Sequence, residues 1–462
     1  MKIKAAEIAK ICQGEILCGD PEKIVKGVAI DSRLVKKDDL FVPFRGVHTD
    51  GHLHIAKAYK GGAAGSLYAS DESPDFQVAK GFFLLRVNDS LQALQRLATA
   101  YREYFDLPVI GITGSSGKTT TKDFLAGVLS VKYNVLKTTG NLNNEIGLPL
   151  TIMKLAKDHQ VAVLEMGMTA TGEIRDLCHI AKPEIGIITN IGMAHVEQLG
   201  SLDAIAKAKT ELLDYLGSGG IAVLNSDDSR LLKIGKRFPG KVYYYGFNQG
   251  DIECLELSQR GEKSFFRVRF PNKSEGWFEA PLPGREMIGN TLAALTVGYI
   301  FQLTIPEMQK GLVGSDLTEG RLQLKKGQSG VRIIDDSYNA NPDSFQAAIK
   351  VLISLAQGKK GAVIGDMLEL GNEAQISHLT LGEVLGDAAL DFLITIGDLA
   401  SLTAKRAEAK GIKVYSCQSH EEATGILSSL NLSDEWSVLV KGSRGMKMDI
   451  IVHNLINMEG AV

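Results

Sequence analysis

The residue types best suited to chemistry lie in one glycine-rich stretch, TGSSGKTT at residues 113–120, between an apolar run and a helical pattern. Such a loop gathers backbone N–H groups, a helix N-terminus and the Lys118 ammonium around one point, which is what a polyphosphate requires. The Thr119 hydroxyl is suited to bind magnesium. The residues predicted to hold a nucleotide are Gly114, Ser115, Ser116, Gly117, Lys118, Thr119 and Thr120.

Three charged side chains elsewhere could join the same chemistry. Glu165 closes an apolar strand that should lie beside the strand before the loop, so its carboxylate could reach a metal ion on the phosphates. Asp336 follows another buried strand and suits ribose hydroxyls or a cation, while Arg321 offers a guanidinium to a phosphate. A glutamate at a strand end is often only solvated, and an isolated arginine is more often a surface residue.

For three further residues, the sequence pattern does not decide between a functional and a structural role. His195 lies in a loop after a strand end, where a histidine is more often a hydrogen-bonded surface group than a ligand. Lys209 lies on an amphipathic helix, and nothing in the pattern separates it from Lys207. Asn341 precedes Pro342, so it is equally a helix cap and a site residue.

The elements that must position these residues alternate between strand and helix from residue 107 onwards. Apolar runs that end in polar residues are typical of buried parallel strands, and ligands bind at the carboxyl ends of such strands. Helices are expected near residues 91–104, 122–129 and 287–301. Strands are expected at residues 30–33, 39–43, 81–87, 161–166, 185–190, 220–225, 331–335, 361–365, 392–396, 413–415 and 437–440, with antiparallel additions at 242–247 and 265–270.

This pattern predicts an α/β protein of three domains, because 462 residues exceed one compact core. Residues 1–87 form a small mixed α/β N-terminal domain. Residues 88–314 form a central doubly wound ATPase domain of the phosphate-loop type. Residues 315–462 form a C-terminal Rossmann-like domain that would close on the nucleotide.

Composition excludes several other classes of protein. A net charge of -3 provides no field to hold nucleic acid or an anionic membrane. No apolar stretch approaches the roughly 18 residues of a membrane span, and the first residues do not resemble a signal peptide. The five cysteines are scattered and lack metal-binding spacing, which favours a reduced, cytoplasmic location.

Eight motifs in succession resemble those of the Mur ligase family and cover essentially the whole chain. The phosphate loop and ITNIGMAHVEQLGS are shared by all Mur ligases and by folylpolyglutamate synthetases. DDSYNANPDS, GDMLELG and KGSRG are narrower and resemble the branch that adds D-alanyl-D-alanine. The eight motifs are TGSSGKTTTKDFL, TTGNLNNEIGLPLT, EMGMTATGEI, ITNIGMAHVEQLGS, AKAKTEL, IDDSYNANPDS, GDMLELG and KGSRGMKMD.

The resemblance implies an ATP-dependent, ADP-forming ligase that joins D-alanyl-D-alanine to UDP-N-acetylmuramoyl-tripeptide through an acyl phosphate, in peptidoglycan synthesis. We expect a monomer, because no long exposed apolar helix demands a partner, and we expect no nucleic-acid partner and no membrane insertion. A sister ligase adding one amino acid and a folylpolyglutamate synthetase are alternatives that GDMLELG disfavours. A binding protein that kept the fold and lost catalysis is another. Diaminopimelate and lysine remain equal choices for the third residue of the peptide.

The resemblance also implies roles for particular residues. Lys118 and Thr119 would hold the ATP phosphates and a first magnesium ion, with Glu165 and His195 as metal ligands. Lys209 matches a lysine carbamylated by carbon dioxide, which would stabilise a second magnesium ion. The catalytic set implied is Lys118, Lys209, His195 and Arg321; Asn290 would meet the adenine, Asp336 the ribose and Arg321 the phosphates.

Substrate contacts follow from the same resemblance. Ser32, Arg33, Arg45, Asp50 and His52 would grip the uridine nucleotide, and Thr139, Asn141, Asn143 and Asn144 the peptide arm. Asn339, Asn341, Lys441, Ser443 and Arg444 would line the side of the incoming dipeptide. One departure stands out: Glu286 and Met287 replace the family's usual His-Asn pair before Asn290. We therefore expect reduced affinity for ATP.

Overall fold

The computed structural model describes residues 1–462 except 47–48, 70–80, 194–195, 261–262 and 459–462. The described residues divide into two compact units, each taken by itself below. The first unit comprises Met1–Gly111, Tyr133–Met168 and Gly172–Ile185, and the second comprises Ile112–Lys132, Thr169–Thr171 and Gly186–Val462.

The N-terminal part of the first unit is built on a five-stranded sheet in the order β2-β7-β6-β5-β4. All neighbours are parallel except β2 and β7. Phe41, Tyr68 and Phe82 pack with the start of α2 in its core. A strand at 30–33 was the wrong expectation, because those residues form a bend and turn directly after β4. The elements are β1 (Ile3–Lys4), α1 (Ala5–Cys12), β2 (Glu15–Cys18), β3 (Ile24–Val25), β4 (Gly27–Ala29), β5 (Asp39–Phe41), η1 (Gly51–His54), α2 (Ile55–Lys60), β6 (Gly65–Tyr68), β7 (Phe83–Arg86) and α3 (Ser90–Arg102).

A nine-stranded sheet has the order β16-β15-β14-β13-β12-β11-β8-β10-β9, so β10 neighbours β8 as expected. β13 pairs in parallel with both β12 and β14, which corrects the antiparallel expectation for residues 242–247. β15 is antiparallel to both of its neighbours, as predicted. The strands are β8 (Val109–Thr113), β9 (Val135–Lys137), β10 (Val161–Glu165), β11 (Ile185–Ile188), β12 (Ile221–Asn225), β13 (Lys241–Gly246), β14 (Ile252–Arg260), β15 (Lys263–Arg269) and β16 (Glu275–Ala280).

Helix α4 carries the phosphate loop at its N-terminus. It runs over Lys118–Leu129, and α10 and α11 pack against it. None of the helices in the described part of the chain is long and apolar enough to span a membrane. The other helices of the middle of the chain are α5 (Gly147–Ile152), α6 (Glu173–Ala181), α7 (Val196–Leu199), α8 (Leu202–Leu216), η2 (Gly217–Gly219), α9 (Ser229–Gly235), α10 (Arg285–Ile300) and α11 (Ile305–Val313).

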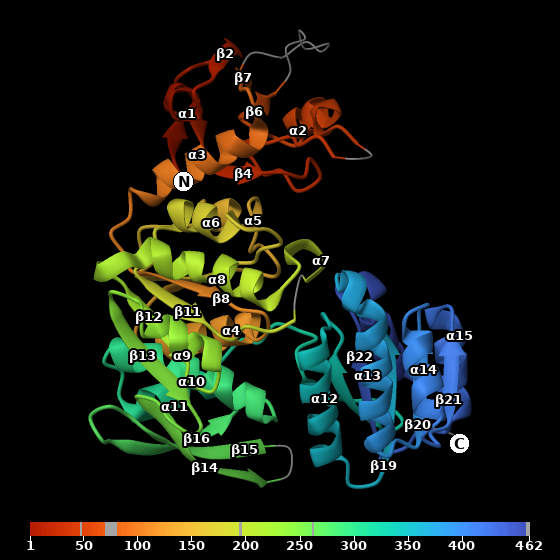
Figure 1. The fold of residues 1–462 in the computed structure, drawn as a ribbon. Coiled ribbons are helices and arrows are strands. Elements are labelled where there is room, and N and C mark those ends of the chain that lie inside the picture. The colour runs from red at the N-terminus through yellow and green to blue at the C-terminus, as the bar shows by residue number, and fades with distance from the viewer. Residues whose placement is uncertain (47–48, 70–80, 194–195, 261–262, 459–462) are drawn as a thin grey trace. The chain divides into compact units, whose positions relative to one another are not determined.

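The C-terminal part of the second unit is a six-stranded sheet in the order β17-β18-β22-β19-β20-β21. All of its neighbours are parallel except β17 and β18. Helices α15 and α16 pack into one core with its strands, and α12 and α14 also cover β22 and β20 (Figure 1). The elements are β17 (Gln323–Lys326), β18 (Arg332–Asp336), α12 (Pro342–Leu355), β19 (Lys359–Gly365), η3 (Gly371–Glu373), α13 (Ala374–Asp387), β20 (Phe392–Ile396), α14 (Ala400–Glu408), β21 (Val414–Cys417), α15 (His420–Ser429), β22 (Trp436–Lys441), η4 (Arg444–Met446) and α16 (Asp449–Asn457).

The strand order of this sheet determines where its polar loops meet. β18, β22 and β19 are adjacent and parallel, so the segments that follow them leave the same edge of the sheet. Those segments carry DDSYNANPDS, KGSRG and GDMLELG. Three motifs far apart in the sequence therefore converge at one edge.

Candidate active site

A cavity of about 740 Å³ lies within the second unit. Its lining includes the phosphate loop, Arg285 to Met287 at the start of α10, Arg321, and the segments that follow β18, β19 and β22. Ligand pockets commonly have volumes of about 300–1,000 Å³, so this cavity has room for a nucleotide.

Glycine is required at two positions of the phosphate loop. Gly114 has a φ of 151° and Gly117 a φ of 79°, values that side chains disfavour. A Cβ at Gly114 would lie 1.8 Å from Thr189 Oγ1, and one at Gly117 would lie 2.3 Å from Asn290 Oδ1. Both residues must therefore be glycine for the loop to keep this conformation.

Asn190, just beyond the end of β11, holds the loop in shape. Its backbone oxygen accepts from Ser115 N at 3.1 Å, and its Oδ1 accepts from Ser116 N at 3.0 Å. Its Nδ2 donates to Ser116 Oγ at 2.9 Å, and Lys118 Nζ donates to the Gly114 oxygen at 2.6 Å. Asn190 was not assigned a role from the sequence, where its only signal was that a polar residue follows an apolar strand.

Asn290 lies against the phosphate loop on α10. It is buried, and its Oδ1 accepts from Thr121 Oγ1 at 3.3 Å. Glu286 and Met287 line the same cavity one turn earlier, and the Arg285 guanidinium lies 3.6 Å from the centroid of the Phe247 ring. The two positions at which Glu286 and Met287 replace the family's His-Asn pair therefore belong to the wall of the cavity.

Arg321 brings a cation to the phosphate loop from the start of the C-terminal sheet. Its Nη2 donates to Thr119 Oγ1 at 3.3 Å, and its guanidinium carbon lies 4.0 Å from the centroid of the Tyr338 ring. Its buried Nε has no hydrogen-bond partner among the described residues. Tyr338 was not singled out from the sequence, because an aromatic residue in a polar loop has no motif of its own.

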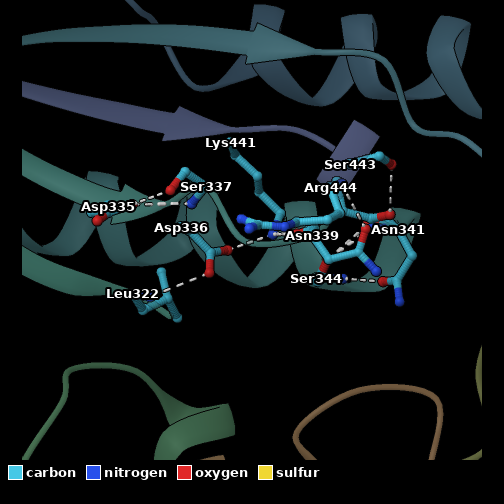
Figure 2. Close-up of polar contacts among 11 residues, drawn as sticks. Leu322, Asp335, Asp336, Ser337, Asn339, Asn341, Ser344, Lys441, Ser443 and Arg444 are labelled. Atoms are coloured by element: carbon cyan, nitrogen blue, oxygen red, sulfur yellow. Dashed lines mark hydrogen bonds and ion pairs between the residues drawn. The ribbon is translucent and has the colours of Figure 1, made fainter. Parts of the chain in front are cut away.

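The two aspartates at the end of β18 face different partners (Figure 2). Asp335 accepts from Ser337 and forms an ion pair with Lys325 at 2.8 Å, outside the cavity. Asp336 lines the cavity, and its Oδ2 accepts from Lys441 Nζ at 2.5 Å. Only the second aspartate is thus placed to meet a ligand.

The remaining residues expected on the dipeptide side are all hydrogen-bonded within the C-terminal loops (Figure 2). Asn341 is the N-cap of α12, accepting from Ser344 N at 2.8 Å, so the helix-cap interpretation is confirmed. Asn339 Oδ1 accepts from Arg444 N at 3.3 Å. Ser443 Oγ accepts from Leu368 N at 2.8 Å and donates to the Ala340 oxygen at 3.4 Å, while its N–H donates to the Asp366 oxygen at 3.0 Å.

Glu165 is the candidate metal ligand of the first unit. It is buried at the end of β10, and its Oε1 accepts from Asn143 Nδ2 at 2.8 Å. Its Oε2 is buried with no hydrogen-bond partner among the described residues. Magnesium prefers oxygen ligands and commonly takes one or two carboxylates beside substrate phosphates, so this oxygen and the Thr119 hydroxyl are of the right kind. The described residues contain no group of three His, Cys, Asp or Glu that could hold a metal ion by themselves.

The structure distinguishes between the two lysines of α8, which the sequence pattern could not do. Lys207 is exposed, whereas Lys209 is 1% exposed. Burial lowers the pKa of Lys209 well below its usual value, and the positive charge of Lys118 acts in the same direction. His195 lies outside the described residues, so its expected metal role stays a prediction.

The expected uridine and peptide contacts lie in the first unit. Asp31 binds the Arg33 guanidinium at 2.6 Å, which lowers the pKa of the Asp31 carboxyl to about 2, and Ser32 lies between them. Asp50 accepts from His52 N at 2.9 Å and pairs with Arg45 at 3.3 Å. Thr139, Asn141 and Asn144 are exposed in the turn before α5, where Asn144 Oδ1 accepts from Gly147 N at 2.9 Å.

Three family models match the chain in succession. The model described as "Mur ligase family, catalytic domain" matches residues 24–102, "Mur ligase middle domain" matches 112–298, and "Mur ligase, glutamate ligase domain" matches 320–444. This succession and the mixed α/β sheets confirm the expected three-domain fold class.

Curated and solved relatives agree with those matches. The UDP-N-acetylmuramoyl-tripeptide–D-alanyl-D-alanine ligase of Bacillus subtilis is 38% identical over 99% of both chains. A MurF crystal structure from Acinetobacter baumannii has a TM-score of 0.89 at 30% identity, covering 99% of both chains. MurF ligase from Thermotoga maritima in complex with ADP has a TM-score of 0.82 at 30% identity, covering 93% of this chain and 97% of that one.

Proposed function

Because this chain belongs to the Mur ligase family, we propose that it joins D-alanyl-D-alanine to UDP-N-acetylmuramoyl-tripeptide while ATP is converted to ADP and inorganic phosphate. The observation that carries the proposal is the cavity that brings the phosphate loop together with Arg321 and the three loops of the C-terminal sheet. The Bacillus subtilis relative carries this activity in its name, and the ADP bound to the Thermotoga maritima relative supports a nucleotide in this cavity.

The chemistry explains why a nucleotide is required. A carboxylate does not condense with an amine in water, because it repels the nucleophile and has no good leaving group. Attack of the terminal carboxylate of the tripeptide on the γ-phosphorus forms an acyl phosphate, while the bond to the bridging oxygen breaks and ADP leaves. The amine of the dipeptide then adds to the acyl carbon and loses a proton. The tetrahedral intermediate expels inorganic phosphate.

The protein mainly supplies positive charge and positioning, because both steps gather negative charge at one place. Lys118 and Arg321 each bring a side-chain cation to the loop. Thr119, Glu165, His195 and Lys209 as its carbamate would hold two magnesium ions, which would neutralise charge on the phosphate oxygens. Glu165 Oε2, buried without a described partner, supports this assignment.

The environment of Lys209 supports its carbamylation. Only a neutral amine attacks carbon dioxide, giving a carbamate and releasing a proton. The lowered pKa of the buried Lys209 favours the neutral amine near neutral pH. The product is an anion that could stabilise a metal ion, whereas the ammonium would repel one.

Substrate contacts extend away from the phosphates. We assign the uridine nucleotide to Ser32, Arg33, Arg45, Asp50 and His52, and the peptide arm to the loop of Thr139, Asn141, Asn143 and Asn144. Arg444 is exposed at the edge of the cavity and is suited to the dipeptide carboxylate, next to Asn339, Asn341 and Ser443. Residues 315–462 would close on the nucleotide and exclude water from the acyl phosphate. Identical small-angle scattering with and without an ATP analogue and the uridine substrate would contradict closure.

A phosphate-release assay tests the proposal. It crosses uridine-linked tripeptides containing diaminopimelate or lysine against D-alanyl-D-alanine, D-alanine and glutamate, with and without EDTA. We expect steady release only with ATP, magnesium, a tripeptide and D-alanyl-D-alanine. Release with a single amino acid instead would favour a sister ligase. No release under any condition would favour a non-catalytic binding protein.

A further inference from the structure

Lys441 is buried at the end of β22, and its ammonium is bound within the protein. Its side chain is 1% exposed. Nζ donates to Asp336 Oδ2 at 2.5 Å and to the Asn339 oxygen at 2.9 Å, and it lies 5.3 Å from the centroid of the Phe345 ring. Two of the three donors of the ammonium therefore go to oxygens of the segment that follows β18. These contacts tie Lys441 to Asp336.

The partner of Lys441 connects it to the backbone beside Arg321. Asp336 and Lys441 are direct neighbours in the register of β18 and β22. The other carboxylate oxygen, Asp336 Oδ1, accepts from Leu322 N at 3.2 Å (Figure 2). A lysine at the end of one strand thus fixes a carboxylate that in turn fixes the residue following Arg321.

The backbone around Arg321 needs such a restraint. Leu322 has a φ of 53° and Gly320 a φ of 71°, so a left-handed residue lies on each side of Arg321. A residue with a side chain, such as leucine, adopts this region only when its surroundings impose it. The N–H of Leu322 is held by Asp336, and the Gly320 oxygen accepts from Tyr338 N at 3.1 Å.

We propose that Lys441 is a positioning residue for Arg321: it holds Asp336, Asp336 holds the left-handed Leu322 backbone, and that backbone directs the guanidinium toward Thr119. The inference rests on the proposed function, because it takes Arg321 as a phosphate-binding group. It differs from the sequence-based expectation, in which Lys441 lined the dipeptide site. Lys441 acts on the nucleotide end of the reaction.

A double-mutant cycle with a matched control tests this assignment. The variants are Lys441→Met, Asp336→Asn and their combination in the full-length chain. Lys325→Met is the control, because Lys325 of β17 pairs at 2.8 Å with Asp335, the residue before Asp336 on β18, and neither Lys325 nor Asp335 lines the cavity. The readouts are calorimetric binding of a non-hydrolysable ATP analogue and separate KM values for ATP and D-alanyl-D-alanine.

We expect Lys441→Met to weaken binding of the analogue about tenfold, because it leaves a buried carboxylate unpaired. Asp336→Asn should do the same, and the double variant should be no weaker than Asp336→Asn alone. The KM for D-alanyl-D-alanine should stay within about twofold of the wild type throughout, and Lys325→Met should bind the analogue as the wild type does.

Two results would overturn the inference: additive losses in the double variant, or a raised KM for the dipeptide with unchanged binding of the analogue. A merely destabilising substitution lowers the active fraction and hence kcat, but it changes neither KM. If Lys441→Met does not fold, Asp336→Asn and the double variant, which removes the unpaired charge, still decide the question. Because binding of the analogue requires no ligation, a failure of the proposed function would show separately in the wild-type assay.

Discussion

The guanidinium of Arg321 lies over the ring of Tyr338, with 4.0 Å between the guanidinium carbon and the ring centroid. Arg444 approaches the same ring at 5.3 Å. One aromatic side chain therefore lies beside both the arginine that reaches Thr119 and the arginine assigned to the dipeptide.

Replacing this ring should weaken the ligase without unfolding it. Tyr338→Leu removes a cation–π contact of about 1 kcal/mol, so kcat/KM should fall about fivefold. Tyr338→Phe keeps the aromatic face and should remain close to the wild type. Initial rates of phosphate release measure the activity of both variants. Equal losses in both would show that the hydroxyl, not the ring, matters.

The two lysines of α8 form a matched pair of substitutions. Lys209→Ala should abolish activity, and short carboxylates such as acetate should restore part of it by standing in for the carbamate. Lys207→Ala removes an exposed side chain and should keep wild-type turnover. Ligation is measured with increasing acetate. Unimpaired turnover of Lys209→Ala would remove the carbamate from the mechanism.

The nucleotide end of the cavity can be tested by restoring the family's residues. Glu286→His with Met287→Asn should lower the KM for ATP several-fold, because the chain carries neither side chain of the usual pair. The same two positions changed to Ala are the control for loss of the native residues. A wild-type KM for ATP equal to that of the Bacillus subtilis relative, measured alongside, would refute the expectation of reduced affinity.

The lowered pKa of His378 predicts how the stability of the folded protein depends on pH. Burial lowers the pKa of this fully buried imidazole below 6.5, although its bond to Ala374 and the charge of Asp366 oppose the shift. Its Nε2 accepts from Met367 N at 3.0 Å, beside the GDMLELG loop. The folded protein thus binds fewer protons than the unfolded chain. Stability should be full above about pH 6.5 and fall as the pH drops through the lowered pKa.

Thermal unfolding measured between pH 7.5 and 5 checks this sign. His378→Gln should start from a lower midpoint and lose less of it on acidification than the wild type. His453→Gln, at an exposed position on α16, should follow the wild-type curve. A wild-type midpoint that rises on acidification would contradict the assignment.

Local patterns predicted those parts of the site that a single stretch of chain determines. The glycine loop and helix around Lys118 are one such part, and the end of β18 with Asp336 is another, because strand, loop and helix follow one another there. The fold class could also be predicted, since alternating apolar runs determine parallel sheets. The direction of β13 could not, because it depends on which strand the chain pairs with next.

Residues that act through distant partners left no local signal. Asn190 holds a loop more than 70 positions earlier, and Lys441 meets Asp336 across 105 positions. Lys207 and Lys209 have the same chemistry two positions apart, and only the packing of α8 decides which is desolvated. Asn143 was expected at the peptide arm, yet its side chain also holds Glu165.

The hydroxyl and backbone of Ser443 join the loops that carry DDSYNANPDS, GDMLELG and KGSRG. A graft of any one of these segments from a relative with another acceptor would disturb the bonds made through Ser443. Engineering a new acceptor preference into this scaffold therefore calls for exchanging all three segments together. Libraries that vary one segment at a time would mostly sample damaged proteins.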